Sequence, residues 1–294
     1  MPLPGCPASS RSGFPSPPGD PSLVRRGGNE MGVLDDIVRE KRAEIAESRA
    51  RSSLGELRAA CRDLPPAVDF AAALRPGPTA GVNLIAEVKR ASPSRGILSA
   101  DLDPISQSRR YAAAGASAIS VLTDQKYFYG SLDDLAAVRT AVGLPVLRKE
   151  FILDEYQLWQ SRAAGADAVL LIAAALDPRA LEDLLRAAKG IGLGTLVEVH
   201  TADELEGVLP LGAPVIGVNN RDLQTLQTSL DPSLRLLPRI PPGAVAVSES
   251  GISSAEDVER VVAAGAHAIL VGEALVRAPD VEAKVRELLL AGRV

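Results

Sequence analysis

Eight short apolar runs alternate with amphipathic helical stretches between residue 82 and the C-terminus, and this repetition limits the possible folds more than any other feature of the chain. The runs occupy residues 82–88, 117–122, 145–147, 168–172, 195–199, 215–218, 245–247 and 268–271. Consecutive runs are far enough apart for one strand, one helix of about three turns and two short loops. Because the runs are almost continuously apolar, we expect parallel strands that are buried on both faces.

Eight strand–helix units in one chain favour a closed (β/α)8 barrel, the TIM barrel, over an open doubly wound sheet. The first run is not followed by the Gly-x-Gly-x-x-Gly pattern that is typical of dinucleotide-binding sheets. Several helical stretches end in Ala-Gly-Ala or Leu-Gly, and we expect each of these glycines to cap its helix. The predicted fold class is therefore α/β, with a single barrel.

Two segments precede the barrel. Residues 1–30 are crowded with Pro, Gly and Ser and show neither strand nor helix periodicity, which predicts a disordered leader and makes Met31 an alternative translation start. In residues 31–81, apolar side chains recur with helical spacing at positions 34, 37, 38 and 45. We expect this part to form an extra N-terminal helical segment near one mouth of the barrel. Residues 31–294 would then make up one catalytic domain.

Composition excludes several classes of protein. With 294 residues, 46% of them hydrophobic, the chain is long enough to bury a barrel-sized core. A formal net charge of −5 provides no long-range attraction for nucleic acid, and there is no apolar run of about 18 residues that could span a membrane. Cys6 and Cys61 show neither metal-binding nor redox spacing, which favours a reducing compartment, the cytoplasm. We expect a small-molecule partner and a monomer or weak homo-oligomer.

Polar residues gather where the apolar runs end. They are Glu87 and Lys89; Arg148, Lys149 and Glu150; Glu198 and His200; Asn219, Asn220, Arg221 and Asp222; Ser248, Glu249, Ser250 and Gly251; and Gly272 and Glu273. Glu87 and Lys89 are two positions apart, so they project from the same face of a strand. A single charge at a strand end is more often part of a structural ion pair than a catalyst, but the carboxyl ends of barrel strands meet at one mouth. The convergence of several such ends predicts an active site there.

Two further patterns suggest ligand contacts at this mouth. Gly251, at the start of the seventh helix, and Gly272 lie where barrels of this kind commonly bind phosphate through backbone N–H groups, although glycine is also frequent in ordinary turns. Aromatic residues make up only 3% of the chain, yet three of them fall in the segment 126–131, and Phe151 follows the third run. Such a cluster predicts either contact with a planar ligand or an apolar anchor for the loop. His200 can share the face of Glu198 or begin a loop, whereas His267 precedes the last run, where we expect a structural role.

These motifs resemble the indole-3-glycerol-phosphate synthase family of tryptophan biosynthesis. The resemblance runs from about Met31 to the C-terminus. It rests on six segments in order, at residues 85–94, 121–131, 147–152, 196–200, 217–223 and 248–252. Glu150 departs from the family pattern, in which Asp is more common at this position.

The resemblance implies a lyase that converts 1-(2-carboxyphenylamino)-1-deoxyribulose 5-phosphate into indole-3-glycerol phosphate, carbon dioxide and water, with no cofactor and no metal. It implies that Lys149 is the general acid at the carbonyl oxygen and Glu198 the general base. We expect low-dielectric walls and neighbouring cations to bring the pKa of Lys149 nearer to neutrality. Glu87 and Lys89 would form a second acid–base pair.

The same resemblance implies the remaining roles. Asn219, Arg221, Glu249 and Ser250 would hold the hydroxyl groups and the anthranilate-derived carboxylate, and Asn219, Glu249 and Ser250 count among the catalytic residues. Ser92, Phe128 and Phe151 would line an aromatic pocket. Ser250, Gly251, Gly272 and, through its backbone, Glu273 would border the phosphate.

Three alternatives stay open. A barrel like phosphoribosylanthranilate isomerase would bind a similar ligand, but it would need Asp and Cys at strand ends, and neither cysteine lies at one. An aldolase would use Lys149 as a Schiff-base nucleophile. A non-catalytic barrel would leave the polar mouth unexplained.

Overall fold

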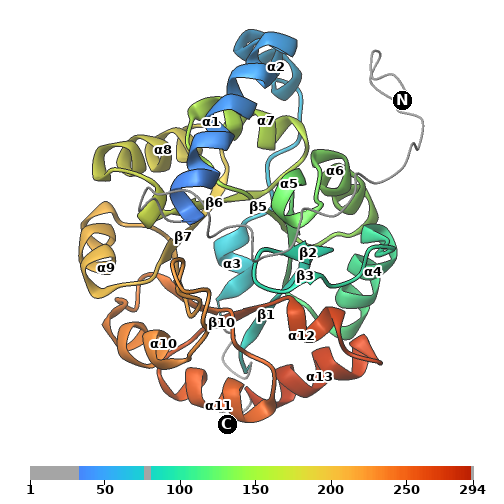
Figure 1. Ribbon diagram of the computed structural model, residues 1–294, viewed down its shortest axis with the longest axis vertical. Helices are drawn as coiled ribbons and strands as arrows, with labels where there is room; N and C mark the ends of the chain where they lie inside the picture. Colours follow the sequence, from blue (N-terminus) through green and yellow to red (C-terminus); the bar gives the residue numbers. More distant parts are fainter. Residues whose placement is uncertain (1–32, 76–80, 293–294) are drawn as a thin grey trace, which may run out of the picture. The chain divides into compact units, whose positions relative to one another are not determined.

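Residues 33–75 and 81–292 are described by the computed structural model, and they contain a closed barrel of eight parallel strands (Figure 1). The strands are β1 (Asn83–Val88), β4 (Ala118–Leu122), β5 (Val146–Lys149), β6 (Ala168–Ile172), β7 (Gly194–Val199), β8 (Val215–Asn219), β9 (Val245–Glu249) and β10 (Ala268–Val271). Each strand pairs with the next along the chain, and β1 pairs with both β4 and β10. The predicted α/β barrel is therefore confirmed, with every strand within two residues of its expected bounds.

An outer ring of helices surrounds the strands (Figure 1). The ring consists of α4 (Pro104–Ala114), α6 (Leu132–Ala141), α7 (Glu155–Ala163), α8 (Pro178–Gly190), α9 (Ala202–Val208), α10 (Asp231–Leu236), α11 (Ala255–Ala263) and α13 (Val281–Ala291). Gly115 ends α4 with a φ of 108°, a left-handed conformation that costs glycine little. The Ala-Gly-Ala glycines after α7 and α11, Gly165 and Gly265, also have positive φ. Glycine therefore ends these helices as predicted.

Along the strands, the side chains inside the barrel change from apolar to charged between one inward-facing position and the next. A layer of four apolar side chains, contributed by alternate strands, is fully buried or nearly so: Ile85, Leu147, Leu196 and Val247. Two positions further along the same four strands come Glu87, Lys149, Glu198 and Glu249, which we call the charged layer. The strand repeat that packs the core thus also places three carboxylates and one ammonium at its carboxyl end.

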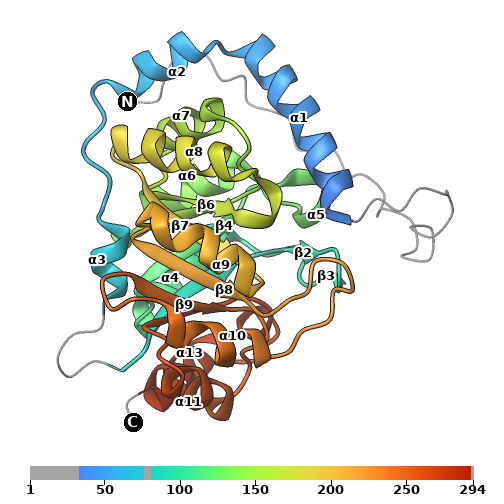
Figure 2. The same cartoon turned by 90° about the vertical axis from the view of Figure 1, so that its left-hand side faces the viewer.

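The N-terminal segment is helical, as the sequence predicted. It contains α1 (Val33–Arg51), α2 (Leu54–Cys61) and α3 (Phe70–Leu74). Figure 2 shows α1 on the same side of the barrel as the loop that follows β1, and α3 on the opposite side. Phe70 and Leu74 pack against Ala168 and other interior residues of the strands. The segment therefore covers both ends of the barrel, rather than the one mouth that was expected.

Short elements interrupt the loops at the carboxyl end. The residues after β1 make a small antiparallel pair, β2 (Ala91–Ser92) and β3 (Gly96–Ile97). The aromatic segment after β4, expected to be a loop, contains the helix α5 (Gln125–Phe128). Within the described ranges, no helix is both long and apolar enough to cross a membrane. The predicted leader, residues 1–30, lies outside the described residues.

Candidate active site

A cavity of about 500 Å³ opens at the carboxyl ends of the strands. Its walls contain every residue to which the family resemblance assigned a role: Glu87, Lys89, Ser92, Phe128, Lys149, Phe151, Glu198, Asn219, Arg221, Glu249, Ser250, Gly251, Gly272 and Glu273. These residues come from segments up to 186 residues apart, between Glu87 and Glu273. Barrel closure therefore gathers this set around one space, whereas the other polar residues predicted at the strand ends do not line it: Arg148, His200, Asn220, Asp222 and Ser248.

Lys149 lies at the centre of the charged layer. Its Nζ is 2.8 Å from Oε2 of Glu198 and 2.7 Å from Oε2 of Glu249; the two carboxyl groups are buried, and the Lys149 side chain is 13% exposed. Glu87 forms an ion pair with Lys89, which follows β1. The layer thus consists of one ammonium shared by two carboxylates, beside a second ion pair.

The expectation of a lowered pKa for Lys149 is wrong. Burial alone would lower it, but the negative charges of Glu198, Glu249 and Glu87 outweigh burial and raise the pKa of Lys149 above its usual range. The sequence-based argument assumed neighbouring cations, whereas the nearest charged groups are carboxylates. Lys149 is therefore an ammonium in the free enzyme.

The two carboxyl groups beside Lys149 differ in their protonation. Burial raises the pKa of both, but Lys149, His200 and Asn219 stabilise the Glu198 carboxylate and bring its pKa down to about 2. Glu249 has Lys149 as its partner, while the charges of Glu198 and Glu87 oppose its ionisation, so its pKa rises to about 7. Its Oε1 is buried without a hydrogen bond. Near neutral pH the pair therefore holds one ionised carboxylate and one carboxyl group that can give or take a proton.

Two glycines leave space for these carboxyl groups. A Cβ at Gly217, on β8, would overlap Oε1 of Glu249, and a Cβ at Gly272 would overlap Oε1 of Glu87. Neither glycine has a positive φ. The close approach of a carboxyl group is therefore a physical reason for glycine at both positions.

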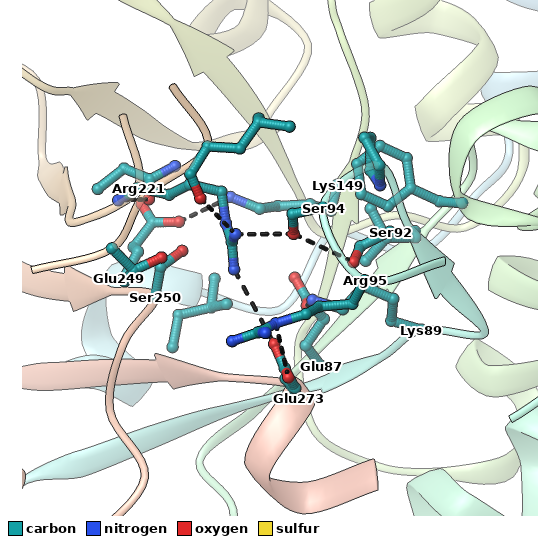
Figure 3. Close-up of a pocket in the computed structure, with 18 of the residues that line it drawn as sticks. Glu87, Lys89, Ser92, Ser94, Arg95, Lys149, Arg221, Glu249, Ser250 and Glu273 are labelled. Carbon is teal, nitrogen blue, oxygen red and sulfur yellow. Dashed lines mark hydrogen bonds and ion pairs between the residues drawn. The ribbon is translucent and has the colours of Figure 1, made fainter. Parts of the chain in front are cut away.

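Arginine side chains surround Glu273 at the edge of the cavity. Oε1 of Glu273 forms ion pairs with Nε of Arg95 and Nε of Arg277, each at 3.2 Å, and Oε2 lies 4.0 Å from Nη2 of Arg221. Figure 3 shows Arg221 between Ser94 and Glu273, and its Nη1 donates to Oγ of Ser94 at 2.7 Å. Neither Arg95 nor Arg277 had a predicted role, although Arg95 follows Ser-Pro-Ser directly. Positive charge thus collects beside Glu273, next to Gly272, one of the two glycines expected to border the phosphate.

The backbone at those turns has a special conformation. Ser250 and Gly251 have φ values of 66° and 77°, and a positive φ is strained for a residue with a side chain. A Cβ at Gly251 would also lie 2.6 Å from Cγ2 of Thr228. Gly251 was expected at the start of the helix after β9, but this helix, α11, starts at Ala255. Gly272 directly precedes the short helix α12 (Glu273–Val276).

Apolar side chains form the opposite wall. The rings of Phe128 and Phe151 have their centroids 6.5 Å apart, and Val33, Leu34 and Ile37 of α1 extend the wall. The sequence showed the helical spacing of Leu34 and Ile37, but it did not show that these residues lie at the cavity. Phe128 lines the cavity, whereas its neighbour Tyr127 attaches the segment to α1 by a hydrogen bond to Glu40 at 2.7 Å rather than by an apolar contact.

A buried lysine ties α1 to the strand that carries Lys149. Lys41 is 4% exposed, and its Nζ lies 2.9 Å from Asp124 and 3.1 Å from Glu150. Glu150 also accepts a hydrogen bond from Thr123 at 2.8 Å. The sequence did not indicate the buried position of Lys41, because a lysine in an amphipathic helix is expected to face solvent.

The remaining candidates divide between the site and the scaffold. His200 lies beside Glu198, with its Nε2 3.4 Å from Oε1 of the carboxylate. His267 accepts a hydrogen bond from the N–H of Ala246 at 2.9 Å, a structural role as predicted. Cys61 is half-buried at the end of α2, and burial raises the pKa of its thiol, which disfavours the reactive thiolate.

An ammonium held between an ionised and a protonatable carboxyl group is suited to acid–base catalysis. With the cavity at the carboxyl end of the strands, fold and site define a (β/α)8-barrel enzyme. A model of the family "Indole-3-glycerol phosphate synthase" matches residues 34–288. The chain belongs to this family, whose members are carboxy-lyases of tryptophan biosynthesis.

Relatives cover almost the same range. The chain is 51% identical over 258 residues to an indole-3-glycerol phosphate synthase of a Nocardioides species, covering 88% of this chain and 98% of the relative. It is 48% identical over 258 residues to the enzyme of Desulfosudis oleivorans, covering 87% and 98%. Among solved structures, 3-hexulose-6-phosphate synthase from Salmonella typhimurium is similar with a TM-score of 0.58 and 16% identity, covering 71% of this chain and 98% of that one. This last likeness concerns the fold alone.

Proposed function

We propose that the charged layer carries out the ring closure of 1-(2-carboxyphenylamino)-1-deoxyribulose 5-phosphate. The observation that carries the proposal is the position of Lys149, whose ammonium group lies between Glu198 and Glu249 in the wall of the cavity. The aromatic ring of the substrate attacks the ribulose carbonyl carbon, and negative charge develops on the carbonyl oxygen. An ammonium group that faces this oxygen stabilises the charge and supplies the proton.

Decarboxylation and dehydration follow in the same cavity. We assign to Glu198, ionised in the free enzyme, the removal of a substrate proton during dehydration, while the ammonium group of Lys89 or Lys149 gives the proton with which the hydroxyl group leaves as water. Since the substrate carboxylate leaves as CO2, each turnover consumes one proton, and Glu249, with a pKa of about 7, is suited to transfer it. Glu87 and Lys89 form the second acid–base pair.

Substrate recognition divides between the two walls of the cavity. Phe128, Phe151 and Ser92 would contact the aromatic part of the substrate, while Asn219 and Arg221 would hold its hydroxyl groups and carboxylate. The phosphate would lie near the backbone of Ser250, Gly251, Gly272 and Glu273. Arg95 and Arg277 support this placement, because their positive charges lie beside Glu273.

The charge of Lys149 argues against a Schiff-base aldolase. An amine must be neutral to attack a carbonyl carbon, and the surrounding carboxylates raise the pKa of Lys149. We therefore expect no covalent adduct when the enzyme is mixed with substrate and borohydride. The isomerase alternative is not favoured by the family, and in the described part of the chain no cysteine lies at a strand end.

Replacement of Lys149 by methionine tests the proposal. Lys149→Met keeps most of the side-chain volume but has no ammonium group, so we expect kcat to fall at least about 100-fold while the fold is kept. The control is Lys189→Met, which removes an exposed lysine of α8. Turnover is followed by the fluorescence of the indole product. Normal kcat with a raised KM would show that Lys149 only binds substrate.

We further propose that the enzyme acts in the cytoplasm, without a nucleic-acid partner and as a monomer or weak homo-oligomer. The net charge of −5 and the use of only two cysteines support the first two points. Size-exclusion chromatography with light scattering would settle the third.

A further inference from the structure

His200 lies just beyond β7, between two carboxylates from different elements. Its Nε2 is 3.4 Å from Oε1 of Glu198, on the strand, and its Nδ1 is 3.4 Å from Oε2 of Glu204, on α9. Glu204 also accepts the backbone N–H of His200 at 2.7 Å. The side chains of Glu198, His200 and Glu204 are 3%, 11% and 22% exposed. The imidazole thus connects the buried carboxylate of the charged layer with one nearer the surface.

This arrangement favours the doubly protonated ring. A neutral imidazole has a proton on one nitrogen and a lone pair on the other. Because a carboxylate oxygen faces each nitrogen of His200, either neutral tautomer would place a lone pair against a negative charge. The imidazolium avoids this repulsion at both nitrogens. Nε2 is buried and makes no hydrogen bond, and the Glu198 carboxylate faces it at 3.4 Å.

We propose that His200 is a positioning residue whose imidazolium holds the Glu198 carboxylate in the orientation that reaches Lys149, and that loss of the ring proton releases this carboxylate. The inference rests on the catalytic role proposed for Glu198. It adds a pH-dependent element to the site, because Oε2 of Glu198 contacts Lys149 while Oε1 faces the imidazole.

The charged groups around the ring determine the direction of its pH dependence. Glu198 of β7, Glu204 of α9 and Glu249 of β9 all act on His200, while Lys149 of β5 lies beyond Glu198. Asp222, in the loop after β8, also interacts electrostatically with His200. Burial opposes the charged ring, but the hydrogen bond with Glu204 and the carboxylates outweigh it and raise the pKa of His200 above 6.5. The imidazolium is therefore present at mildly acidic pH and is lost as the pH rises.

The other histidine provides an internal control. The chain contains two histidines, and His267 accepts the N–H of Ala246 at its Nδ1, which must then be unprotonated. Burial and the charge of Arg75 lower the pKa of His267. The two rings are thus expected to titrate on opposite sides of 6.5.

NMR of the full chain labelled with 15N-histidine tests the protonation directly. We expect His200 at about pH 6 to have both ring nitrogens protonated, and His267 to be neutral. Glu204→Gln keeps an acceptor but removes the charge, so the midpoint of His200 should fall by about one pH unit or more, while that of His267 stays unchanged. A neutral His200 at about pH 6 in the wild-type enzyme would overturn the proposal.

Kinetics test the consequence for catalysis. We expect His200→Gln to lower kcat about tenfold with little change in KM. Glu204→Gln should be as active as the wild type at low pH. As the pH is raised, the activity of the variant should begin to fall at a lower pH than that of the wild type, a result that a merely structural role would not produce. This variant keeps the imidazole, so the proposal is tested even if His200→Gln fails to fold.

The two proposals fail in different ways. If the titrations hold but His200→Gln keeps the wild-type kcat and pH profile, His200 does not position Glu198 and the inference is wrong. If Glu198→Gln is fully active, the assignment of the base fails instead, although the ring titrations would remain as described.

Discussion

Replacing Gly217 with alanine should separate the function of the barrel from its stability. The added Cβ would overlap Oε1 of Glu249 and lie 3.1 Å from its Cδ and from Cδ1 of Leu196. The carboxyl group is the free end of a flexible side chain, so it can turn away, but its oxygen must move by about 1 Å or more to reach van der Waals distance. This movement breaks the contact of 2.7 Å between Glu249 and Lys149.

Misplacement of a catalytic group by about 1 Å can cost about 100-fold in rate, which corresponds to roughly 2.7 kcal/mol in the activation free energy. We therefore expect kcat of Gly217→Ala to fall about 100-fold, measured by indole fluorescence at saturating substrate. The free energy of unfolding, measured with urea, should change by no more than about 1 to 2 kcal/mol.

The matched control is Gly207→Ala, on helix α9. A Cβ there meets no atom within 4 Å, and the backbone has no positive φ. This variant should keep its activity and become more stable by about 0.5 to 1 kcal/mol, the usual gain for alanine over glycine within a helix. A fully active Gly217→Ala enzyme would refute the reasoning, because it would show that Glu249 does not need its observed position.

Two further predictions concern the N-terminal part of the chain. Lys41→Met leaves Asp124 and Glu150 buried without their ammonium partner, so urea unfolding near pH 7 should show a loss of about 3 to 5 kcal/mol. Burial raises the pKa of Glu150, but Arg148 and Lys41 outweigh burial and lower this pKa. The stabilising contribution of the Glu150 carboxylate is therefore lost as the pH falls, and the difference in unfolding free energy between the variant and the wild type should become smaller in acid. An equal loss of stability at about pH 4 would contradict this explanation. A chain that starts at Met31 should keep its kcat and melting temperature, since every residue of the described cavity lies beyond it, and a large loss of activity would show that residues 1–30 contribute to the site.

Local sequence patterns predicted the scaffold because they depend on neighbours along the chain. A repeat of two residues on β5 buries Leu147 in the barrel, turns Arg148 toward Gln160 and Ser161 of α7, and returns Lys149 to the cavity. The same alternation at Glu87 and Glu198 was visible without coordinates. The gathering of these ends at one mouth follows from barrel closure, which the number of strand–helix units already indicated.

The electrostatics of the site were beyond the reach of the sequence. Lys149 follows an arginine in the chain, yet its neighbours in space are Glu198 and Glu249, and these carboxylates reverse the predicted direction of its pKa shift. Similarly, Lys41 meets Glu150 across 109 positions of sequence.

The sequence by itself therefore determined the barrel, the strand ends and several of the polar residues that line the cavity, because hydrophobic periodicity and glycine turns act over a few residues. Tertiary structure alone decided which charges pair, which carboxyl group has a raised pKa, and why position 217 is a glycine. The physical reason is that Coulomb energies and steric overlap depend on distances of a few ångströms between atoms from different strands. Those distances exist only once the barrel has closed.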